Sequence, residues 1–446
     1  MRNFSYVIHK NTREFPVKKK LSPILALSLL LSTLCAQENN QRFSFYELVF
    51  SPINATQPRT VTIPDSKIDG VIKNGTSFDG SSIRGYGHIS DSDKLLKVDN
   101  AVQYYVRNND TTTGLYFCNV YEDEKTPYLA DPRTLCTYAI EKLKEQMGYT
   151  LCVGVELEFY LVKKEDWENN KVAPVNESRY FDLESDSSMT TFKLSTMKAL
   201  VDAGVDIEKW HSEVGPAQYE ISIQYNDPIQ VADQLVLAKH VIGLEADRAG
   251  LKAVFMPKPI AKENGTGLHI HFSLWDSNKN VFYDENSKNL SPVAYSFLAG
   301  VMKYISDVSI LFNCHENSFK RLVPGFEAPI YLCYSEKNRS AAFRIPATYN
   351  NGSATRFELR CADTYSNPYL AFSAIILTGL QGLVDKEKAV EPVCQNLYAL
   401  SEKEIADLSI SQLPLSLETA QKNFASSEFI KSHFPTVFRE TFLALY

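Results

Sequence analysis

The sequence lacks any Cys-x-x-Cys pair, although its 446 residues include eight cysteines. The usual ligand spacing of a zinc cluster is therefore missing. Cys118, Cys152 and Cys333 lie inside apolar runs that are typical of strands. We therefore expect buried free thiols of a reducing compartment rather than disulfide bonds or zinc ligands.

A basic surface stripe is also missing. The chain has 46 lysine and arginine residues against 53 aspartate and glutamate residues, a net charge of −7. No basic run is interleaved with aromatic residues, and no repeat or low-complexity segment is visible. This mild acidic excess favours solubility and argues against a nucleic acid as partner.

Near the N-terminus, an apolar run over Leu21–Ala36 follows three lysines. This run is shorter than the roughly 20 residues of a membrane span, so we expect no membrane partner. It resembles a secretory signal peptide, but Leu34 stands where a small residue should precede a cleavage site after Ala36. Ser22 as N-cap and Pro23 at the first helical position favour a buried helix. We therefore expect a cytoplasmic protein, with a signal segment as the alternative.

The length favours two domains, one of them large. A break at Lys125-Thr126-Pro127 and a helix from Pro132 to about Gly148 place the boundary near residue 128. We expect an N-terminal extension over 1–20, a small domain over 21–128 and a large catalytic domain over 129–446. Expected strands lie at 42–50, 59–64, 103–107, 115–121, 151–162, 217–225, 268–275, 329–334, 340–345 and 354–361. Expected helices lie at 186–203, 229–249, 292–313, 367–384 and 416–424.

These elements alternate irregularly, which predicts an α+β fold rather than a βαβ series. For the large domain we expect an antiparallel sheet flanked by helices. The Gly/Ser-rich segment Asn74–Gly87 is too long and polar for a tight turn, so we expect a functional loop there.

Three short runs in the large domain share one pattern: Glu156-Leu157-Glu158, His269-Ile270-His271 and Arg356-Phe357-Glu358-Leu359-Arg360. A strand sends alternate side chains to one face, so each run predicts a row of charged or coordinating groups with apolar residues behind it. So much charge does not suit a core. The runs predict a groove for divalent metals and a phosphate-bearing substrate.

The carboxylates are the strongest part of this prediction. Two buried like charges repel, and each is costly to desolvate, so they need a cation. With Glu213, Glu220 and Glu358, the set suits two Mg²⁺ or Mn²⁺ ions, with His269 as a further ligand. For Glu156 and Glu158 alone, edge-strand charges paired with lysines are an equal alternative.

Two further motifs are weaker. Asn264-Gly265-Thr266-Gly267 leads into the His269 strand and would let backbone amides approach a ligand, although a flexible loop before two satisfied histidines is equally consistent. Guanidinium groups match carboxylates and phosphates bidentately, but these arginines would also form salt bridges with the acidic cluster. The arginines are Arg321, Arg339, Arg344, Arg356 and Arg360.

The ordered set of motifs resembles the type I glutamine synthetases over about residues 25–440. The motifs that carry this resemblance are Phe78-Asp79-Gly80-Ser81-Ser82-Ile83, Gly154–Phe159, Glu213–Glu220, Phe255–Pro259, Asn264–His271, Lys320–Pro329, Asn338-Arg339-Ser340 and Asn367–Ala371. The resemblance implies a small β-grasp-like domain before the catalytic domain. It also implies ATP-dependent ligation of ammonia to L-glutamate through γ-glutamyl phosphate, which gives L-glutamine.

The resemblance further implies roles for the residues. Glu158, Glu213 and Glu220 would hold one metal, and Glu156, His269 and Glu358 the second. Asn264, Gly265, Arg321 and Arg360 would hold glutamate, while His271, Ser273, Arg344 and Arg356 would contact ATP. Arg339 would act on the transferring phosphoryl group and Asp79 as the base for ammonium. Glu327 would close a flap over the site, and Tyr180, Ser82, Glu213 and Glu327 would complete the ammonium pocket.

The family also forms rings in which the Asp79 loop completes a neighbouring subunit's site. We therefore expect a homo-oligomer, a hexameric ring or a dodecamer. The chain departs from the family pattern at His211-Ser212-Glu213 and Pro216-Ala217-Gln218. Both departures resemble relatives that ligate glutamate to amines or polyamines, which is the alternative function.

Overall fold

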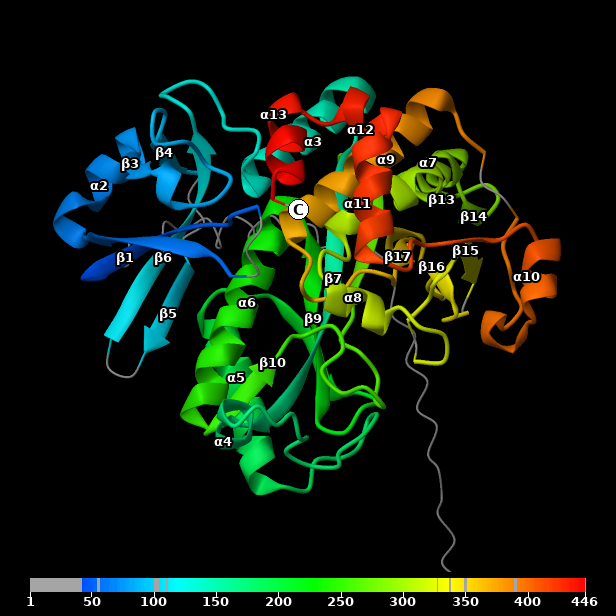
Figure 1. Cartoon of the computed structure of the whole chain (residues 1–446), viewed down its shortest axis with the longest axis horizontal. Coiled ribbons are helices and arrows are strands. Elements are labelled where there is room, and N and C mark those ends of the chain that lie inside the picture. Colours follow the sequence, from blue (N-terminus) through cyan, green and yellow to red (C-terminus); the bar gives the residue numbers. More distant parts are fainter. Residues whose placement is uncertain are drawn as a thin grey trace, which may run out of the picture. The chain divides into compact units, whose positions relative to one another are not determined.

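The computed structural model describes residues 42–53, 57–99, 104–108, 111–326, 328–336, 338–348, 351–388 and 391–445. The expected helix at 21–36 lies outside these residues. Within them, two large sheets and the helices around them form most of the molecule (Figure 1). A third, two-stranded sheet pairs β13 (Tyr283–Asp284) with β14 (Asn289–Leu290). The predicted α+β class is confirmed.

The N-terminal sheet has six strands in the order β2-β1-β6-β4-β3, with β5 also on β6. Its strands are β1 (Phe45–Phe50), β2 (Arg59–Pro64), β3 (Thr76–Asp79), β4 (Asp93–Val98), β5 (Tyr104–Asn108) and β6 (Thr111–Tyr121). Strands β1 and β6 run parallel and the other pairs antiparallel. Helix α2 (Asp65–Asn74) crosses from β2 to β3 and buries Ile68.

The prediction that Asn74–Gly87 is one loop is wrong in part. Thr76–Asp79 pairs with β4, and Gly80–Ser82 forms a short 3-10 helix. Helix α2 and strand β4 were not expected either. Short polar segments of this kind gain their structure from pairing with distant strands, which the local pattern does not reveal.

The large sheet has ten strands in the order β18-β15-β16-β17-β11-β7-β9-β8, with β10 on β7 and β12 on β11. Its central strands are β7 (Thr150–Lys163), β9 (Gln218–Asn226), β11 (Leu268–Asp276) and β17 (Phe357–Leu359), and β8 (Ile207–Ser212) is the edge strand beside β9. Its other strands are β10 (Leu251–Val254), β12 (Lys279–Asn280), β15 (Tyr331–Glu336), β16 (Ala341–Ile345) and β18 (Ser411–Gln412). All described pairs are antiparallel except β15 with β16, so the expected antiparallel sheet contains one parallel pair.

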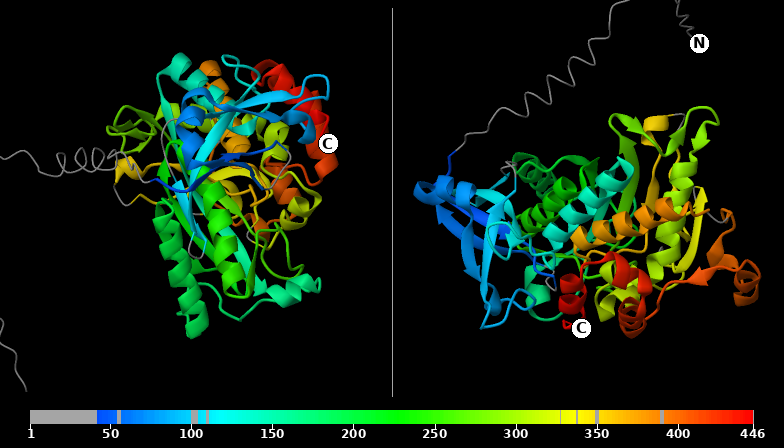
Figure 2. Two further views of the ribbon diagram at one scale, coloured as in Figure 1. Left: turned by 90° about the vertical axis from the view of Figure 1, so that its left-hand side faces the viewer. Right: turned by 90° about the horizontal axis from the view of Figure 1, so that it is seen from above.

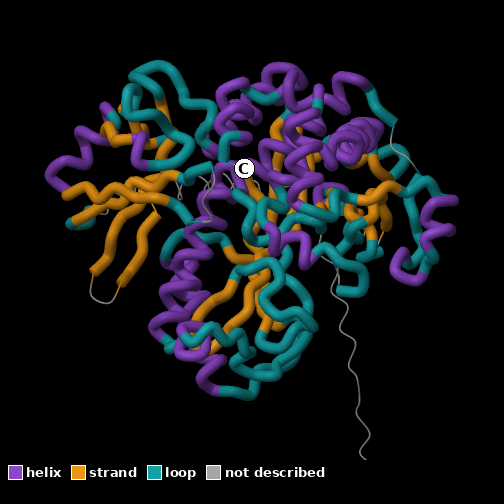
Figure 3. The backbone as a smooth tube through the Cα atoms, in the orientation of Figure 1, coloured by secondary structure: helices purple, strands orange, loops and turns teal. Residues whose placement is uncertain are grey.

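The helices of the large domain flank this sheet (Figure 3). The long ones are α3 (Pro132–Met147), α5 (Ser187–Asp202), α6 (Pro228–Arg248), α7 (Pro292–Val308) and α9 (Pro368–Asp385). The shorter ones are α4 (Lys164–Glu168), α8 (Glu316–Arg321), α10 (Glu402–Asp407), α11 (Leu417–Ser426), α12 (Glu428–His433) and α13 (Thr436–Leu443).

Four of the long helices begin in the same way. Asp131, Asp227, Ser291 and Asn367 accept hydrogen bonds from the first turn, and a proline occupies the next position. This combination satisfies free amide groups and presets the backbone for a helix. The N-cap residue and the proline are visible in the sequence, and each of these four helices begins within a residue or two of its expected start.

Helix α9 is the centre of the helical layer. It packs against α3, α6 and α7, and Figure 2 shows these helices on one side of the large sheet. Among the described residues it is the one helix long and apolar enough to cross a bilayer. Because 78% of its apolar window is buried in the protein, it is a core helix.

The described cysteines are all free thiols, but the prediction that they are buried holds for only four of them. Cys118, Cys136, Cys333 and Cys361 are buried, Cys152 and Cys314 are half-buried, and Cys394 is exposed. Burial raises the pKa of the Cys118, Cys333 and Cys361 thiols to about 12. These thiols are packing residues and not nucleophiles.

Candidate active site

The three charged runs lie on adjacent strands. His269 pairs with Glu156 across β11 and β7, and His271 pairs with Glu358 across β11 and β17. The apolar residues between them, Leu157, Ile270 and Phe357, are buried on the opposite face. The predicted alternation is confirmed, and the sheet register brings the three rows into one cluster.

Two more carboxylates join this cluster from β9 and the end of β8. Glu220 pairs with Glu158 across β9 and β7 and with His211 across β9 and β8. The His211 ring nitrogens lie 3.0 Å from Glu220 Oε1 and 3.6 Å from Glu213 Oε1. His211 was not predicted as a site residue, although His211-Ser212-Glu213 repeats the alternation of the other runs.

The cluster contains three groups of residues whose ligand atoms lie within 4.8 Å of one another. They are Glu156 with His271 and Glu358, Glu156 with Glu220 and His269, and His211 with Glu213 and Glu220. The membership of these groups differs from that of the two expected ligand sets. Glu156 belongs to two of the groups, and His211 and His271 take part although neither was an expected ligand. Nδ1 of His269 lies 2.9 Å from a Glu156 oxygen and 3.8 Å from a Glu358 oxygen, so the three residues of the second expected set lie close together. The division into two ligand sets stays a prediction.

The electrostatics of the cluster favour the binding of a cation. Burial, together with repulsion from Glu213 and Glu220, raises the pKa of Glu158 well above its usual range. Burial alone would raise the pKa of Glu156 too, but His271 and His269 hold it well below its usual range. Burial lowers the pKa of His269, which keeps its imidazole neutral. An oxygen-rich cluster that includes the neutral imidazole of His269 suits divalent cations such as Mg²⁺ or Mn²⁺.

Glu358 is the anchor for two arginines. It is fully buried, accepts a hydrogen bond from Arg360 Nη1 at 2.6 Å and pairs with Arg344. Despite its burial, the Arg360 charge holds the pKa of Glu358 at about 2. The expected internal salt bridges are therefore present for these two arginines.

Arg360 nevertheless keeps free donors. Its Nε and Nη2 atoms are buried without a hydrogen-bond partner among the described residues. Arg321 donates to the backbone carbonyls of Cys361 and Arg360 at 2.9 and 3.1 Å. Buried N–H donors without an acceptor are energetically costly. The Nε and Nη2 edge of Arg360 therefore suits an anionic ligand such as a carboxylate.

The loop before β11 approaches this cluster through its backbone. The Gly267 amide donates to Glu158 at 2.8 Å, while Gln218 donates to Glu158 and to the Gly265 carbonyl, both at 3.0 Å. A Cβ atom at Gly265 would come within 2.4 Å of the Pro257 carbonyl, and one at Gly267 within 2.7 Å of Arg321. Only glycine allows this close approach, so the loop is built into the site.

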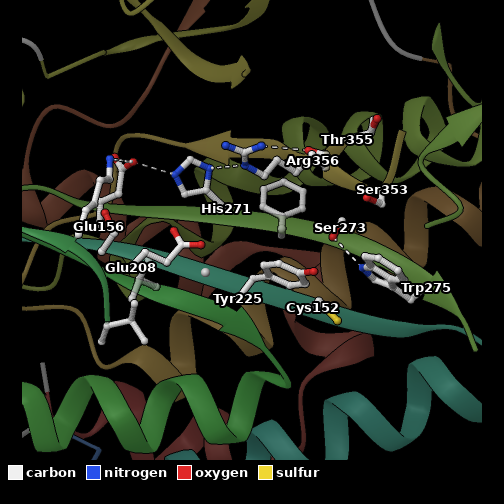
Figure 4. A pocket seen from close by; sticks show the side chains of 17 residues that line it. Cys152, Glu156, Glu208, Tyr225, His271, Ser273, Trp275, Ser353, Thr355 and Arg356 are labelled. Carbon is white, nitrogen blue, oxygen red and sulfur yellow. Dashed lines mark hydrogen bonds and ion pairs between the residues drawn. The ribbon is translucent and has the colours of Figure 1, made fainter. Parts of the chain in front are cut away.

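A cleft of about 340 Å³ adjoins the cluster. Figure 4 shows His271 between Glu156 and Arg356, with contacts of 3.2 Å on both sides. At the far end, Tyr225 and Trp275 stand nearly parallel with ring centres 6.3 Å apart, and Trp275 donates to Ser273. The volume is within the range of ligand pockets, and the aromatic rings were not predicted as part of it.

Other expected site residues form no hydrogen bond with the cluster among the described contacts, or lie at its edge. Asp79 is exposed on the N-terminal sheet and accepts hydrogen bonds from Ser81 and Ser82, which lower its pKa. Arg339 is exposed between β15 and β16, and within the described residues no hydrogen bond joins either of these residues to the cluster. Tyr180 lies at the edge, its ring centre 5.9 Å from that of His211. Glu327 lies outside the described residues.

A buried acidic and imidazole cluster beside an arginine-lined cleft is a site suited to divalent metals and phosphate-bearing substrates. The chain belongs to the glutamine synthetase family and is an enzyme, a ligase. Its residues 42–123 match the profile "Glutamine synthetase, beta-Grasp domain" and 129–446 match "Glutamine synthetase, catalytic domain". The resemblance of the motifs and the β-grasp-like domain are thereby confirmed.

Individual relatives agree with this assignment. A glutamine synthetase of Methanocaldococcus jannaschii is 36% identical over 397 residues, 87% of each chain. One of Clostridium saccharobutylicum is 38% identical over 390 residues, again 87% of each chain. Among solved structures, a Plasmodium falciparum glutamine synthetase has a TM-score of 0.79 at 24% identity and covers 94% of both chains. A GmaS/ADP complex has a TM-score of 0.80 at 24% identity and covers 93% of this chain and 94% of its own, which shows a shared fold.

The cluster leads to a first prediction. Glu220 touches two of the three ligand groups, so Glu220→Gln is expected to weaken Mn²⁺ binding by about tenfold to 100-fold. Isothermal titration of the metal-stripped protein measures this. In the wild type, Mn²⁺ at 100 times its Kd is expected to stabilise the fold by about 2.7 kcal/mol, and a chelator to reverse this. Glu285→Gln, which changes an exposed glutamate, is the control; equal affinity in both variants would contradict the prediction.

Proposed function

We propose that this enzyme ligates ammonia to L-glutamate at the expense of ATP, through γ-glutamyl phosphate. The observation that carries the proposal is the buried Arg360 guanidinium, which has two unpartnered nitrogens and lies beside the carboxylate cluster. A glutamate carboxylate would satisfy these donors. The adjoining cleft would place ATP phosphates next to the same cluster.

In this proposal the metals lie between the substrates. Glu158, Glu213 and Glu220 would hold one ion, and Glu156, His269 and Glu358 the other. His211 and His271 are near enough to contribute, since each lies within 3.2 Å of a cluster carboxylate. Divalent ions supply charge neutralisation and orientation for phosphoryl transfer.

The chain's own residues would position the rest. Arg321, Arg360, Asn264 and Gly265 would hold glutamate, and His271, Ser273, Arg344 and Arg356 would contact ATP. Tyr225 and Trp275 would flank the base at the end of the cleft. Arg339 would stabilise the charge that develops on the transferring phosphoryl group, and Glu327 would shield the acyl phosphate from water.

The ammonium pocket would combine two subunits. Asp79 and Ser82 are exposed and lie apart from the cluster of their own chain, so they are available to a neighbouring copy. Tyr180, Glu213 and Glu327 would form the other half. We therefore also propose a cytoplasmic homo-oligomeric ring, hexameric or dodecameric, with a division of each chain near residue 128.

A second candidate, ligation of an organic amine, is favoured by a cavity of about 240 Å³ that is lined by His211 and Ser212. Phe181, Phe192 and Trp210 also line it, and it could receive an alkyl group that ammonia lacks. The structural neighbour titled GmaS is consistent with either acceptor, because the likeness concerns the fold.

An acceptor assay tests the two candidates. Phosphate release with ATP, glutamate and saturating ammonia is expected to exceed release with methylamine or putrescine by about tenfold or more, because a site built for a small cation discriminates by fit. Product identification by mass spectrometry should give glutamine. Faster turnover with an amine would establish the second candidate and overturn the first.

A further inference from the structure

Lys209 is a charged group in the cluster to which no role has been given. It lies on β8, two residues before His211, so its side chain is on the same face as the cluster. Its Nζ lies 3.7 Å from Glu156 Oε1 and 3.6 Å from Glu220 Oε1. Half of the Lys209 side chain is exposed, so protein atoms do not enclose its aliphatic part on all sides.

The position of this ammonium group is unusual among the cations of the site. Arg344 and Arg360 are both bound to Glu358, which is buried. Within the described residues, Lys209 is the only lysine or arginine that forms an ion pair with Glu156 or Glu220. In the proposed function, Glu220 and Glu156 are ligands of different metal ions. The ammonium group of Lys209 therefore contacts one ligand of each proposed metal site.

Lys209 also faces the cleft, since it lines the cavity together with His271, Ser273 and Arg356. A lysine stem has four rotatable carbons, and its ammonium group can change partners without moving the backbone. From Glu156, the nearest new partner along the cleft would be an anionic group beside His271 and Arg356.

We propose that Lys209 is a tethered cation of this active site with two successive partners. Before metals bind, it neutralises Glu156 and Glu220 and competes with the divalent ions. After they bind, it is released to contact the phosphates of the nucleotide. The inference rests on the proposed function, because it assumes that divalent ions and a nucleoside triphosphate occupy the cluster and the cleft.

The test compares Lys209→Met, Lys209→Arg and the wild type as full-length protein. Without nucleotide, Lys209→Met is expected to bind Mn²⁺ about threefold to tenfold more tightly, because two partly exposed ion pairs no longer compete. Lys209→Arg should keep the wild-type affinity. Electron paramagnetic resonance of free Mn²⁺ measures this, and Lys279→Met, which removes an exposed lysine paired with Glu285, is the matched control.

A second measurement tests the phosphate contact. With saturating Mg²⁺, the Kd for a non-hydrolysable ATP analogue should rise about threefold to tenfold in Lys209→Met and stay unchanged in Lys279→Met. Unchanged or weaker Mn²⁺ binding in Lys209→Met would overturn the competition, and an unchanged nucleotide Kd would overturn the phosphate contact. A wild-type protein that binds neither Mn²⁺ nor the analogue would overturn the proposed function itself.

Discussion

Replacing Glu358 with glutamine is expected to reduce the ligation rate by roughly 100-fold or more and to destabilise the subunit by about 3–5 kcal/mol. Glu358 is fully buried and pairs with both Arg344 and Arg360. The neutral side chain keeps the shape but leaves two guanidinium groups without a counter-charge. It also removes one carboxylate from the ligand group of Glu156 and His271.

The loss of stability should depend on pH in a defined direction. The pKa of Glu358 is about 2 in the folded protein, below the usual value of 4.5. A carboxylate with a depressed pKa stabilises the fold above its unfolded pKa, and this contribution is lost as the pH falls from about 4.5 towards 2. The difference in unfolding free energy between wild type and Glu358→Gln should therefore be largest above pH 4.5 and shrink below it.

Denaturant unfolding over this pH range, with steady-state kinetics at neutral pH, measures both effects. Glu336→Gln is the matched control, because Glu336 is exposed on the nearby strand β15. If Glu358→Gln matched this control in both measurements, Glu358 would not be the counter-charge that stabilises Arg344 and Arg360.

The central part of the site could be predicted because its signal is local. Alternation at two-residue spacing placed Glu156, His269 and Glu358 on strand faces, and the structure confirms the three strands. His211-Ser212-Glu213 has the same two-residue spacing, so His211 carries the same local signal. The ligand grouping could not be found this way, because it depends on the register of β8 on β9 and of β7 on β11.

The contacts of the cleft also depend on distant pairing. Tyr225 and Trp275 lie 50 positions apart in the numbering and meet because β9 and β11 flank β7. Arg344, expected at the nucleotide, lies against Glu358 because β16 pairs with β17. Its predicted ATP contact stays a prediction, as do the roles of Asp79, Arg339, Tyr180 and Glu327. Those residues depend on substrates or on a second subunit, which the sequence pattern of one chain does not specify.

Asp79→Ala is expected to lower ammonia-dependent turnover by about 100-fold to 10,000-fold while nucleotide binding stays as in the wild type. Asp79 is exposed, and its side chain bonds only to Ser81 and Ser82 among the described residues, so the loss of this side chain should not disturb the fold. Arg339→Ala should be similarly inactive, and Arg339 is exposed as well. Fluorescence titration with an ATP analogue verifies that the binding sites of both variants are intact.

Mixing these two inactive variants tests whether a site is shared between subunits. If Asp79 serves the neighbouring subunit and Arg339 its own, an active site needs an Asp79→Ala subunit beside an Arg339→Ala subunit in the correct order. Random co-assembly at equal amounts should then restore about a quarter of the wild-type activity, since each requirement is met half of the time. Co-expression with two affinity tags isolates the mixed oligomers. If both residues served one site in one chain, every site would lack one of them and no activity would return.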